Sequence, residues 1–463
     1  MADRLSALDV SFLYAEEPTT PMHVGGVAVF EPPSRGFDYD HLVRLIERRI
    51  ALVPRYRQKV VGVPGHLGNP VWVDDSGFDI GYHVRRSALP RPGSDLQLAE
   101  LVSRLMSRPL DRSRPLWEMY CVEGVHDGRI ALISKTHHAM VDGVSAVDLT
   151  QVILDPTPQP REVPEELWMP RPAPGPVELV LDAVADLAGR PSAALDTVRM
   201  GIRDVQHTAE TILGAIGGLA AAARTAARPA QDSPFNVPIG AQRRFAVART
   251  ELDDYKRVRK QHGGTVNDVV LATVAGALRG FLMTRGEPVT SASEIRAMVP
   301  VSVRTDTGQG ATGNRILSYF VDLPVGEPDP LVRLSRVSYA MKAHKEAGQS
   351  VGADALIRLS GFAPPTLHAM GARAASSLSR RLFNVVVTNV PGPQMPLYAG
   401  GARMLEVFPV VPLAKGQAVS IGLTSYDGGV YYGLNADRDA MSDVGILASL
   451  IEESLAELVG LLP

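Results

Sequence analysis

Apolar and polar residues along the first 155 positions alternate with two periods, one close to two residues and one close to three and a half. Runs rich in branched and aromatic side chains predict β-strands at 23–30, 71–73, 117–122 and 130–135. Apolar residues three and four positions apart predict helices at 41–50 and 96–106. The first part of the chain is therefore predicted to mix strands and helices.

The second half of the chain shows the same mixture. Helical spacing is found at 267–282 and 330–345. Strands are predicted at 296–303, 316–323, 384–388, 419–425 and 430–435. The pattern favours an α/β (α+β) fold built from two similar halves.

A proline-rich stretch separates these halves. Eight prolines between residues 156 and 176 interrupt any regular element, and residues 177–230 then return to helical spacing and become alanine-rich. We therefore divide the chain into an N-terminal domain at 1–155, a linker at 156–240 and a C-terminal domain at 241–463.

Composition narrows the function without naming it. The chain has 463 residues, 45% of them hydrophobic, and a net charge of -3, so it has no basic footprint for nucleic acid. The single cysteine, Cys121, fits a reducing compartment and is expected to be buried. No signal peptide is expected at the start, and the most membrane-like stretch, 212–223, is too short to span a bilayer. Peripheral contact with lipid stays open.

The clearest chemistry lies after the strand at 130–135, where His137 and His138 are followed by Asp142 and Gly143. A neutral imidazole can take a hydroxyl proton and return it within one turnover. The spacing after Gly143 predicts a strand-to-helix turn, and an extended backbone at the pair would point the two rings to opposite sides. Two other readings stay open. Histidines beside core strands are often structural, and zinc is the weaker alternative because neither a cysteine cluster nor His-Glu-x-x-His spacing occurs.

Several motifs point to one family. The His-His-x-x-x-Asp-Gly motif resembles the signature of the CoA-dependent acyltransferase superfamily, which includes chloramphenicol acetyltransferase and peptide-synthetase condensation domains. Four further segments, in family order, resemble the bacterial wax ester synthase/acyl-CoA:diacylglycerol acyltransferase family. They are the opening at 5–13 with 21–25, the Pro-Leu-Trp motif at 115–117, the Asn-Asp motif at 267–268 and the late Thr-Asn-Val-Pro-Gly-Pro segment at 388–393.

The resemblance implies two chloramphenicol-acetyltransferase-like domains that form a pseudo-dimer, with a tunnel between them where acyl-CoA meets the acceptor at His138. It implies an O-acyltransferase that moves a long-chain acyl group from acyl-CoA to diacylglycerol, and also to fatty alcohols. The alternatives are acylation of another lipid or polyketide alcohol, or a non-catalytic scaffold on lipid droplets or membranes. No cofactor and no metal is expected. The expected location is cytoplasmic, with peripheral contact at the inner membrane face or on lipid droplets.

Each motif residue receives a role. His138 is the expected general base, His137 supports it, and Asp142 anchors the loop through an ion pair, with Arg304 as the proposed partner. Gly143 permits tight backbone geometry. Two roles stay open for each of the remaining motifs. Pro115, Leu116 and Trp117 are expected to pack in the core or to line the tunnel. Asn267 and Asp268 are expected to cap a helix or to contact substrate, and Thr388 and Asn389 to form a turn or to contact the oxyanion.

Overall fold

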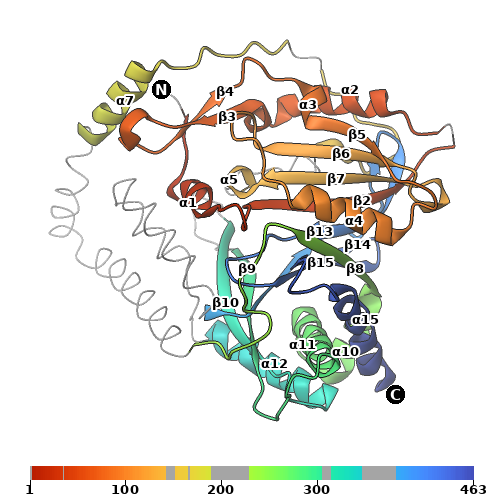
Figure 1. Ribbon diagram of the computed structural model, residues 1–463. Coiled ribbons are helices and arrows are strands. Elements are labelled where there is room, and N and C mark those ends of the chain that lie inside the picture. The colour runs from red at the N-terminus through yellow and green to blue at the C-terminus, as the bar shows by residue number, and fades with distance from the viewer. Residues whose placement is uncertain are drawn as a thin grey trace.

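The structure is a computed structural model of the 463-residue chain. It describes residues 3–34, 36–141, 152–164, 167–188, 229–304, 314–346 and 382–463. Two six-stranded sheets, one above the other in Figure 1, form the centres of the two halves.

The first sheet holds the predicted strands of the N-terminal half. Its order is β12-β13-β2-β7-β6-β5. In chain order these strands are β2 (His23–Glu31), β5 (Val84–Ala88), β6 (Trp117–Glu123), β7 (Ile130–His137), β12 (Tyr398–Ala399) and β13 (Ala402–Val410). Both faces of β7 are buried, because Ile130 and Leu132 belong to one apolar cluster while Ala131 and Ile133 belong to another. That explains its almost continuous apolar sequence.

Helices cover the two faces of this sheet. The helices of the first half are α1 (Ala7–Ala15), α2 (Tyr39–Arg49), α3 (Ile80–His83), α4 (Asp95–Met106) and α5 (His138–Val141). Residues of α2 pack into the cluster on one face and residues of α4 into the cluster on the other. A capping box starts α4, since Ser94 and Gln97 satisfy each other's backbone N–H groups.

A small sheet lies at the outer end of the first half, in the order β1-β4-β3. Its strands are β1 (Asp3–Arg4), β3 (Gln58–Val61) and β4 (Val71–Asp74), and helix α7 (Pro176–Ala188) places Leu179 and Ala183 in the same apolar cluster as Val71. Short 3₁₀ turns occupy Ile50–Leu52, Pro54–Arg57, Pro64–His66 and His126–Gly128. Helix α7 falls in the predicted helical stretch 177–230; residues 189–228, which include 212–223, lie outside the described residues.

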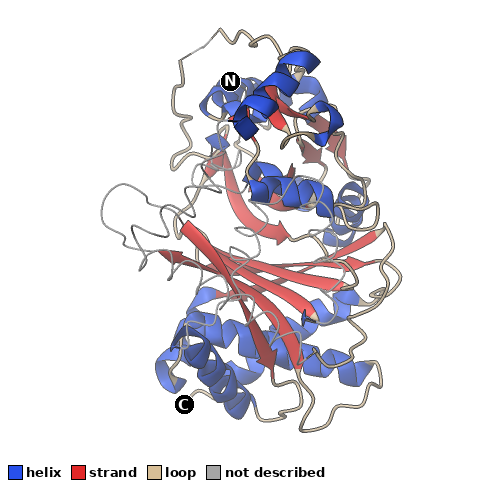
Figure 2. Ribbon diagram, turned by 90° about the vertical axis from the view of Figure 1, so that its left-hand side faces the viewer, coloured by secondary structure: helices blue, strands red, loops and turns tan. Residues whose placement is uncertain are grey.

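The second sheet has the order β10-β9-β11-β14-β15-β8. Its strands are β8 (Arg243–Glu251), β9 (Ile295–Arg304), β10 (Asn314–Leu323), β11 (Val385–Pro391), β14 (Val419–Tyr426) and β15 (Gly429–Asp437). Figure 2 shows helices gathered on one side of this sheet: α10 (Leu252–His262), α11 (Val266–Thr284), α12 (Pro330–Glu346) and α15 (Val444–Gly460). Helix α11 is, among the described helices, the one long and apolar enough to cross a membrane, yet its side chains fill the core under this sheet.

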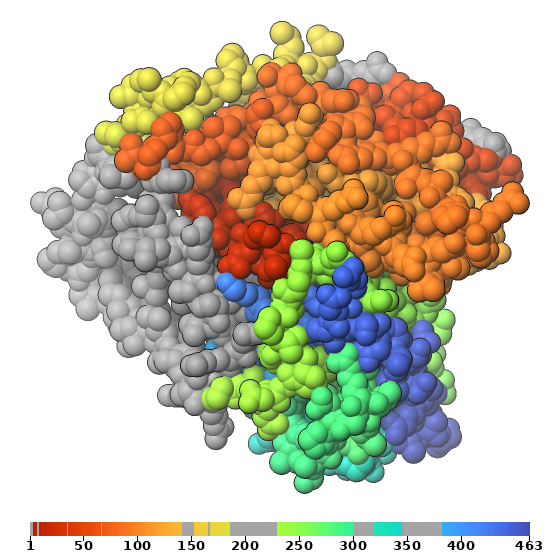
Figure 3. Space-filling view, in the orientation of Figure 1, coloured from red at the N-terminus to blue at the C-terminus, as the bar shows by residue number. Residues whose placement is uncertain are grey.

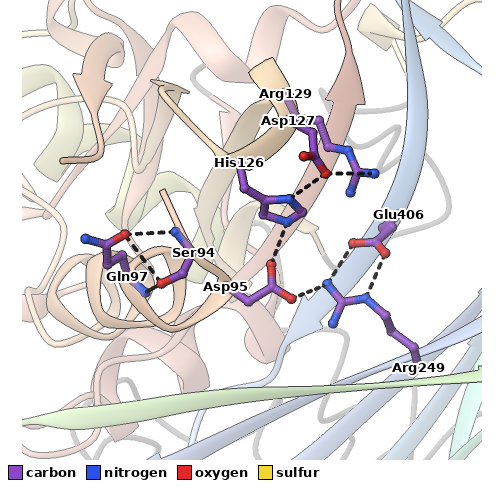
Figure 4. A network of polar contacts seen from close by, with 8 residues as sticks. All are labelled: Ser94, Asp95, Gln97, His126, Asp127, Arg129, Arg249 and Glu406. Atoms are coloured by element: carbon purple, nitrogen blue, oxygen red, sulfur yellow. Dashed lines mark hydrogen bonds and ion pairs between the residues drawn. The ribbon is translucent and has the colours of Figure 1, made fainter. Parts of the chain in front are cut away.

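The two halves exchange structure at their junction. Strands β12 and β13 come from the last 70 residues but complete the first sheet, where β13 pairs with β2. Figure 4 shows a second link, in which Arg249 of β8 binds both Asp95 of α4 and Glu406 of β13. The α/β expectation with two sheet-centred halves is confirmed. The division at residues 155 and 240 stays a prediction, and β12 and β13 show that sheet membership does not follow it.

Candidate active site

The histidine pair lies at the end of β7, where the chain turns from strand to helix. His137 is the last residue of β7 and His138 the first of α5. The backbone N–H of His137 donates to the Leu116 carbonyl at 2.9 Å, and that of His138 donates to the Met22 carbonyl at 2.9 Å. The predicted strand-to-helix turn is therefore present, and hydrogen bonds from two other segments fix its backbone.

The ring of His137 is buried and occupied with holding the turn. Its Nδ1 accepts the backbone N–H of Ala139 at 3.0 Å, so His137 acts as an N-cap for α5. That bond leaves the proton on Nε2, which faces Oε2 of Glu16 at 3.8 Å. Burial, with further contributions from Arg112 and His138, lowers the pKa of His137 to about 3. A neutral ring whose lone pair is engaged is suited to support rather than to proton transfer.

The ring of His138 has a different environment. The ring stacks on Phe12, with ring centroids 4.7 Å apart and planes 18° apart. Unlike His137, the residue as a whole is only partly buried. Burial of most of the ring lowers the pKa of His138 to about 4. The imidazole is therefore unprotonated at neutral pH and can accept a proton from a group that reaches it.

The two rings are not directed away from each other in the way an extended backbone would impose, because β7 ends at His137 and His138 is already helical. Both contact the C-terminal end of α1, His138 through Phe12 and His137 through Glu16. These two contact residues are four apart, one helical turn. Sequence reasoning missed both as site residues, although Phe12 lies in the segment that carried the family resemblance; their spacing was the available signal.

The Pro-Leu-Trp motif packs beneath the histidines. Leu116 and Trp117 are each about 1% exposed. The indole N–H of Trp117 donates to the Tyr56 carbonyl at 2.8 Å. The Trp117 ring stacks on the ring of His83, with the ring centroids 4.6 Å apart. Pro115 is buried as well. All three residues of the motif are buried, and Leu116 adds the carbonyl that holds His137.

The Asn-Asp motif and the late Thr-Asn segment meet in the second half. Nδ2 of Asn389 donates to Oδ1 of Asn267 at 3.3 Å. Asp268 accepts the backbone N–H of Thr265 at 2.8 Å and completes a capping box in which Thr265 is the N-cap residue. The expected turn at Thr388 and Asn389 is wrong, because both lie in β11 and pair with Gly422 and Leu423 of β14. The strand continues to Pro391.

The remaining predicted residues are only partly described. Asp142 and Gly143 lie outside the described residues. Arg304 is the last residue of β9, and its side chain also lies outside the described part of the structure. The ion pair between Asp142 and Arg304 therefore stays a prediction. Cys121 is fully buried and free, and burial raises its pKa to about 12. Within the described part of the chain, no group of three or more histidine, cysteine or acidic residues is arranged to hold a metal ion.

Comparison with known proteins gives the family. The wax ester synthase/diacylglycerol acyltransferase catalytic domain matches residues 5–270, and the C-terminal domain of the same family matches residues 312–459. The chain belongs to the wax ester synthase/diacylglycerol acyltransferase family.

Other members of this family resemble the whole chain. The probable diacylglycerol O-acyltransferase tgs2 of Mycobacterium tuberculosis is 36% identical over 468 residues, covering 98% of each chain. The probable diacylglycerol O-acyltransferase tgs1 of the same organism is 34% identical, covering 99% of this chain and 96% of the relative. The wax ester synthase/diacylglycerol acyltransferase of Marinobacter aquaeolei VT8 superposes with a TM-score of 0.69 at 28% identity, covering 99% of this chain and all of that one.

The fold extends beyond the family. The first condensation domain of the calcium-dependent antibiotic synthetase has a TM-score of 0.61 at 16% identity, covering all of this chain and 97% of that one. At this identity the likeness concerns the fold alone.

Proposed function

We propose that this protein transfers a long-chain acyl group from acyl-CoA to the hydroxyl of diacylglycerol, giving triacylglycerol and free CoA. The observation that carries the proposal is His138: an unprotonated imidazole on a partly exposed residue of a hydrogen-bonded turn, in a chain that matches acyltransferases over nearly its whole length. Long-chain alcohols are the second acceptor class, supported by the wax ester synthase named above.

The proposed reaction is one displacement with a single proton carrier. His138 removes the proton from the acceptor hydroxyl as its oxygen attacks the thioester carbonyl. The carbon–sulfur bond then breaks, and the proton passes from His138 to the departing sulfur. Because a thiol has a pKa near about 8.5, the thiolate leaves without a strong acid. Both substrates supply all the atoms exchanged, so we propose that no cofactor takes part.

His137 has a separate task in this scheme. Its cap on the Ala139 N–H holds the first turn of α5, which carries His138. The buried, neutral ring at position 137 also places no positive charge beside the base. We therefore assign proton transfer to His138 and support of the turn to His137.

We further propose that the protein works in the cytoplasm against a lipid surface, because its acceptor lipids are insoluble in water. Helix α7 supports this, since Val177, Leu181 and Val184 form an exposed apolar stripe at spacings of four and three residues, with exposures of 72%, 63% and 53%. Flotation with neutral phospholipid vesicles that contain diacylglycerol tests it. Wild-type protein is expected to float with the vesicles and Leu181→Glu to stay behind; equal behaviour would remove α7 from the proposal.

The function is tested with purified protein, labelled palmitoyl-CoA, and either diacylglycerol or hexadecanol. Wild-type protein is expected to form labelled triacylglycerol, and His138→Ala to lose at least about 100-fold in rate while keeping its fold. His126→Ala is a matched control, since that histidine binds Asp95 and Asp127 at the far end of β7. Undiminished product in His138→Ala would contradict the assignment. No product with any alcohol from folded protein that binds acyl-CoA would favour the scaffold role.

A further inference from the structure

Helix α1 and the residues that follow it lie against the histidine pair. In Figure 3 the dark red N-terminal residues sit at the surface junction between the orange first half and the green and blue second half. Phe12 on α1 contacts the ring of His138, and Glu16, the C-cap residue of α1, faces the ring of His137. One helix end therefore touches both members of the motif.

Glu16 reaches the backbone of His138 through Met22. Oε1 of Glu16 accepts the backbone N–H of Met22 at 3.1 Å. The carbonyl of the same residue accepts the backbone N–H of His138 at 2.9 Å. A residue whose N–H and C=O are both hydrogen-bonded cannot shift freely, so the position of the Glu16 carboxylate affects the position of the first residue of α5.

The other carboxylate oxygen faces the ring of His137. Oε2 of Glu16 accepts Nε of Arg112 at 3.0 Å and lies 3.8 Å from Nε2 of His137. Nε2 of His137 is buried without a hydrogen-bond partner in the described structure, so the carboxylate is the charge that its N–H dipole meets. The same carboxylate forms an ion pair with the guanidinium of Arg112, whose positive charge acts on His137.

The segment from Glu16 to Met22 is also held by the second half. Glu17 binds Lys415 at 2.6 Å, and the guanidinium of Arg243 donates to the Thr19 carbonyl. These contacts join the middle of the segment to the second half, and neither of them is made to His137, His138 or Met22. Glu17 thus offers a control of the same residue type, adjacent in sequence, whose ion pair is with Lys415 of the second half and not with Arg112.

We propose that Glu16 is a positioning residue: its carboxylate fixes the His138 backbone through Met22 and holds His137 in its Nε2-protonated form. The inference rests on the proposed function of His138. It does not make Glu16 a proton acceptor from substrate, because both of its oxygens already have partners in the protein.

Three variants test the positioning role. Glu16→Ala removes both the acceptor for Met22 and the charge, Glu16→Gln keeps an oxygen for Met22 but removes the charge, and Glu17→Gln is the control. Each is measured for kcat and KM with palmitoyl-CoA and diacylglycerol, for its thermal midpoint, and for the ¹⁵N resonances of its imidazole rings. The ring resonances report the protonated nitrogen of His137 whether or not the protein is active.

We expect kcat to fall by about 100-fold in Glu16→Ala and about 10-fold in Glu16→Gln, as misplacement of a reacting group does, with KM within about threefold. The His137 Nε2 resonance is expected to move in both, and Glu17→Gln to match wild type in kcat and in that resonance. A kcat within twofold of wild type in either folded Glu16 variant would overturn the proposal. So would a loss of kcat that follows the thermal midpoint while the His137 signals stay unchanged. If Glu16→Ala does not fold, Glu16→Gln decides. If wild-type protein acylates no alcohol, the proposed function fails, and the His137 signals still decide the positioning role.

Discussion

The ion pair between Arg49 and Asp155 allows a sharp test of how the motif-bearing half is held together. Both side chains are 1% exposed, and Nη2 of Arg49 lies 2.7 Å from Oδ2 of Asp155. Nη1 of Arg49 also donates to the Ile153 carbonyl at 2.8 Å. Asp155 pairs through its backbone with Tyr398 at the start of β12, with both hydrogen bonds at 2.8 Å. The ion pair therefore links α2 to the segment that follows the histidine motif. Through Asp155 it also links both to β12, which comes from the second half of the chain.

Removing one member leaves the other charged in a buried place, which costs about 3–5 kcal/mol. In Asp155→Ala the guanidinium keeps its bonds to backbone carbonyls, so we expect the lower end of that range, about 3 kcal/mol. In Arg49→Met the carboxylate keeps, among the described residues, the side chain and backbone N–H of Arg161 at 3.5 and 3.4 Å, so we expect about 5 kcal/mol. The double variant removes both charges, and its loss is expected to be at least about 2 kcal/mol smaller than the sum of the single losses.

Tryptophan fluorescence during urea unfolding is the suitable assay. Trp72 and Trp117 lie in the first half, and Trp168, in the linker, packs against Phe78 of that half, so the signal reports the first half and not the second. This avoids treating the whole chain as one two-state unit. Single-variant losses below about 1 kcal/mol, or a double variant equal to the sum of the singles, would refute the reasoning.

Three further predictions follow from buried groups. Burial lowers the pKa of His83 to about 4 and that of His137 to about 3, so the unfolded chain takes up protons first as pH falls below about 6.5. The free energy of unfolding, measured in urea, should therefore fall by about 1 kcal/mol per histidine between pH 7 and 5.5. An unchanged free energy of unfolding would contradict this. The Cys121 thiol, buried and with its pKa raised to about 12, should resist Ellman's reagent at pH 8 until urea is added; prompt labelling of folded protein would contradict its burial. Trp117→Ala should lower the free energy of unfolding by about 3–5 kcal/mol and Trp117→Phe by about 1–3 kcal/mol. Both variants lose the hydrogen bond to the Tyr56 carbonyl, but only the alanine variant loses the aromatic ring that stacks on His83. Equal losses would refute the stacking contribution.

Strong local periodicity allowed the sequence to predict most elements near the site. The predicted strand at 130–135 is β7 with two more residues, and the predicted helix at 267–282 is α11 with one more residue at its start and two at its end. In both cases burial on more than one side produced long apolar runs that are visible without a structure. Propensity was sufficient because tertiary packing agrees with it.

Elements with weaker patterns were missed. Strand β13 carries Glu406 and Pro409 among its apolar residues, and its place in the first sheet depends on pairing with β2 more than 370 residues earlier. Strand β8 begins Arg243-Arg244 and contains Arg249, which forms ion pairs with Asp95 and Glu406 from distant parts of the chain. Such long-range pairing leaves no local periodicity from which to predict it.

The same limit applies to the candidate site. The motif identified His137 and His138, and the turn that carries them follows from the change of period. The contribution of α1 does not, because the contacts of Phe12 and Glu16 join residues more than 120 positions apart. Likewise the strand assignment of Asn389 was missed, since Pro391 and Pro393 predict a turn locally while pairing with β14 keeps the backbone extended.

The pH dependence of kcat/KM for acylation of diacylglycerol tests the central claim most directly, because it reports the ionisation of the base in the free enzyme. A base whose pKa is lowered to about 4 is still about 97% unprotonated at pH 5.5, whereas an ordinary imidazole of pKa 6.5 is only about 9% unprotonated there. Wild-type kcat/KM, measured on protein shown to be folded, is therefore expected to stay within about twofold between pH 7.5 and 5.5. A tenfold fall over that range, with the fold intact, would contradict the assignment of His138 as the base in this environment.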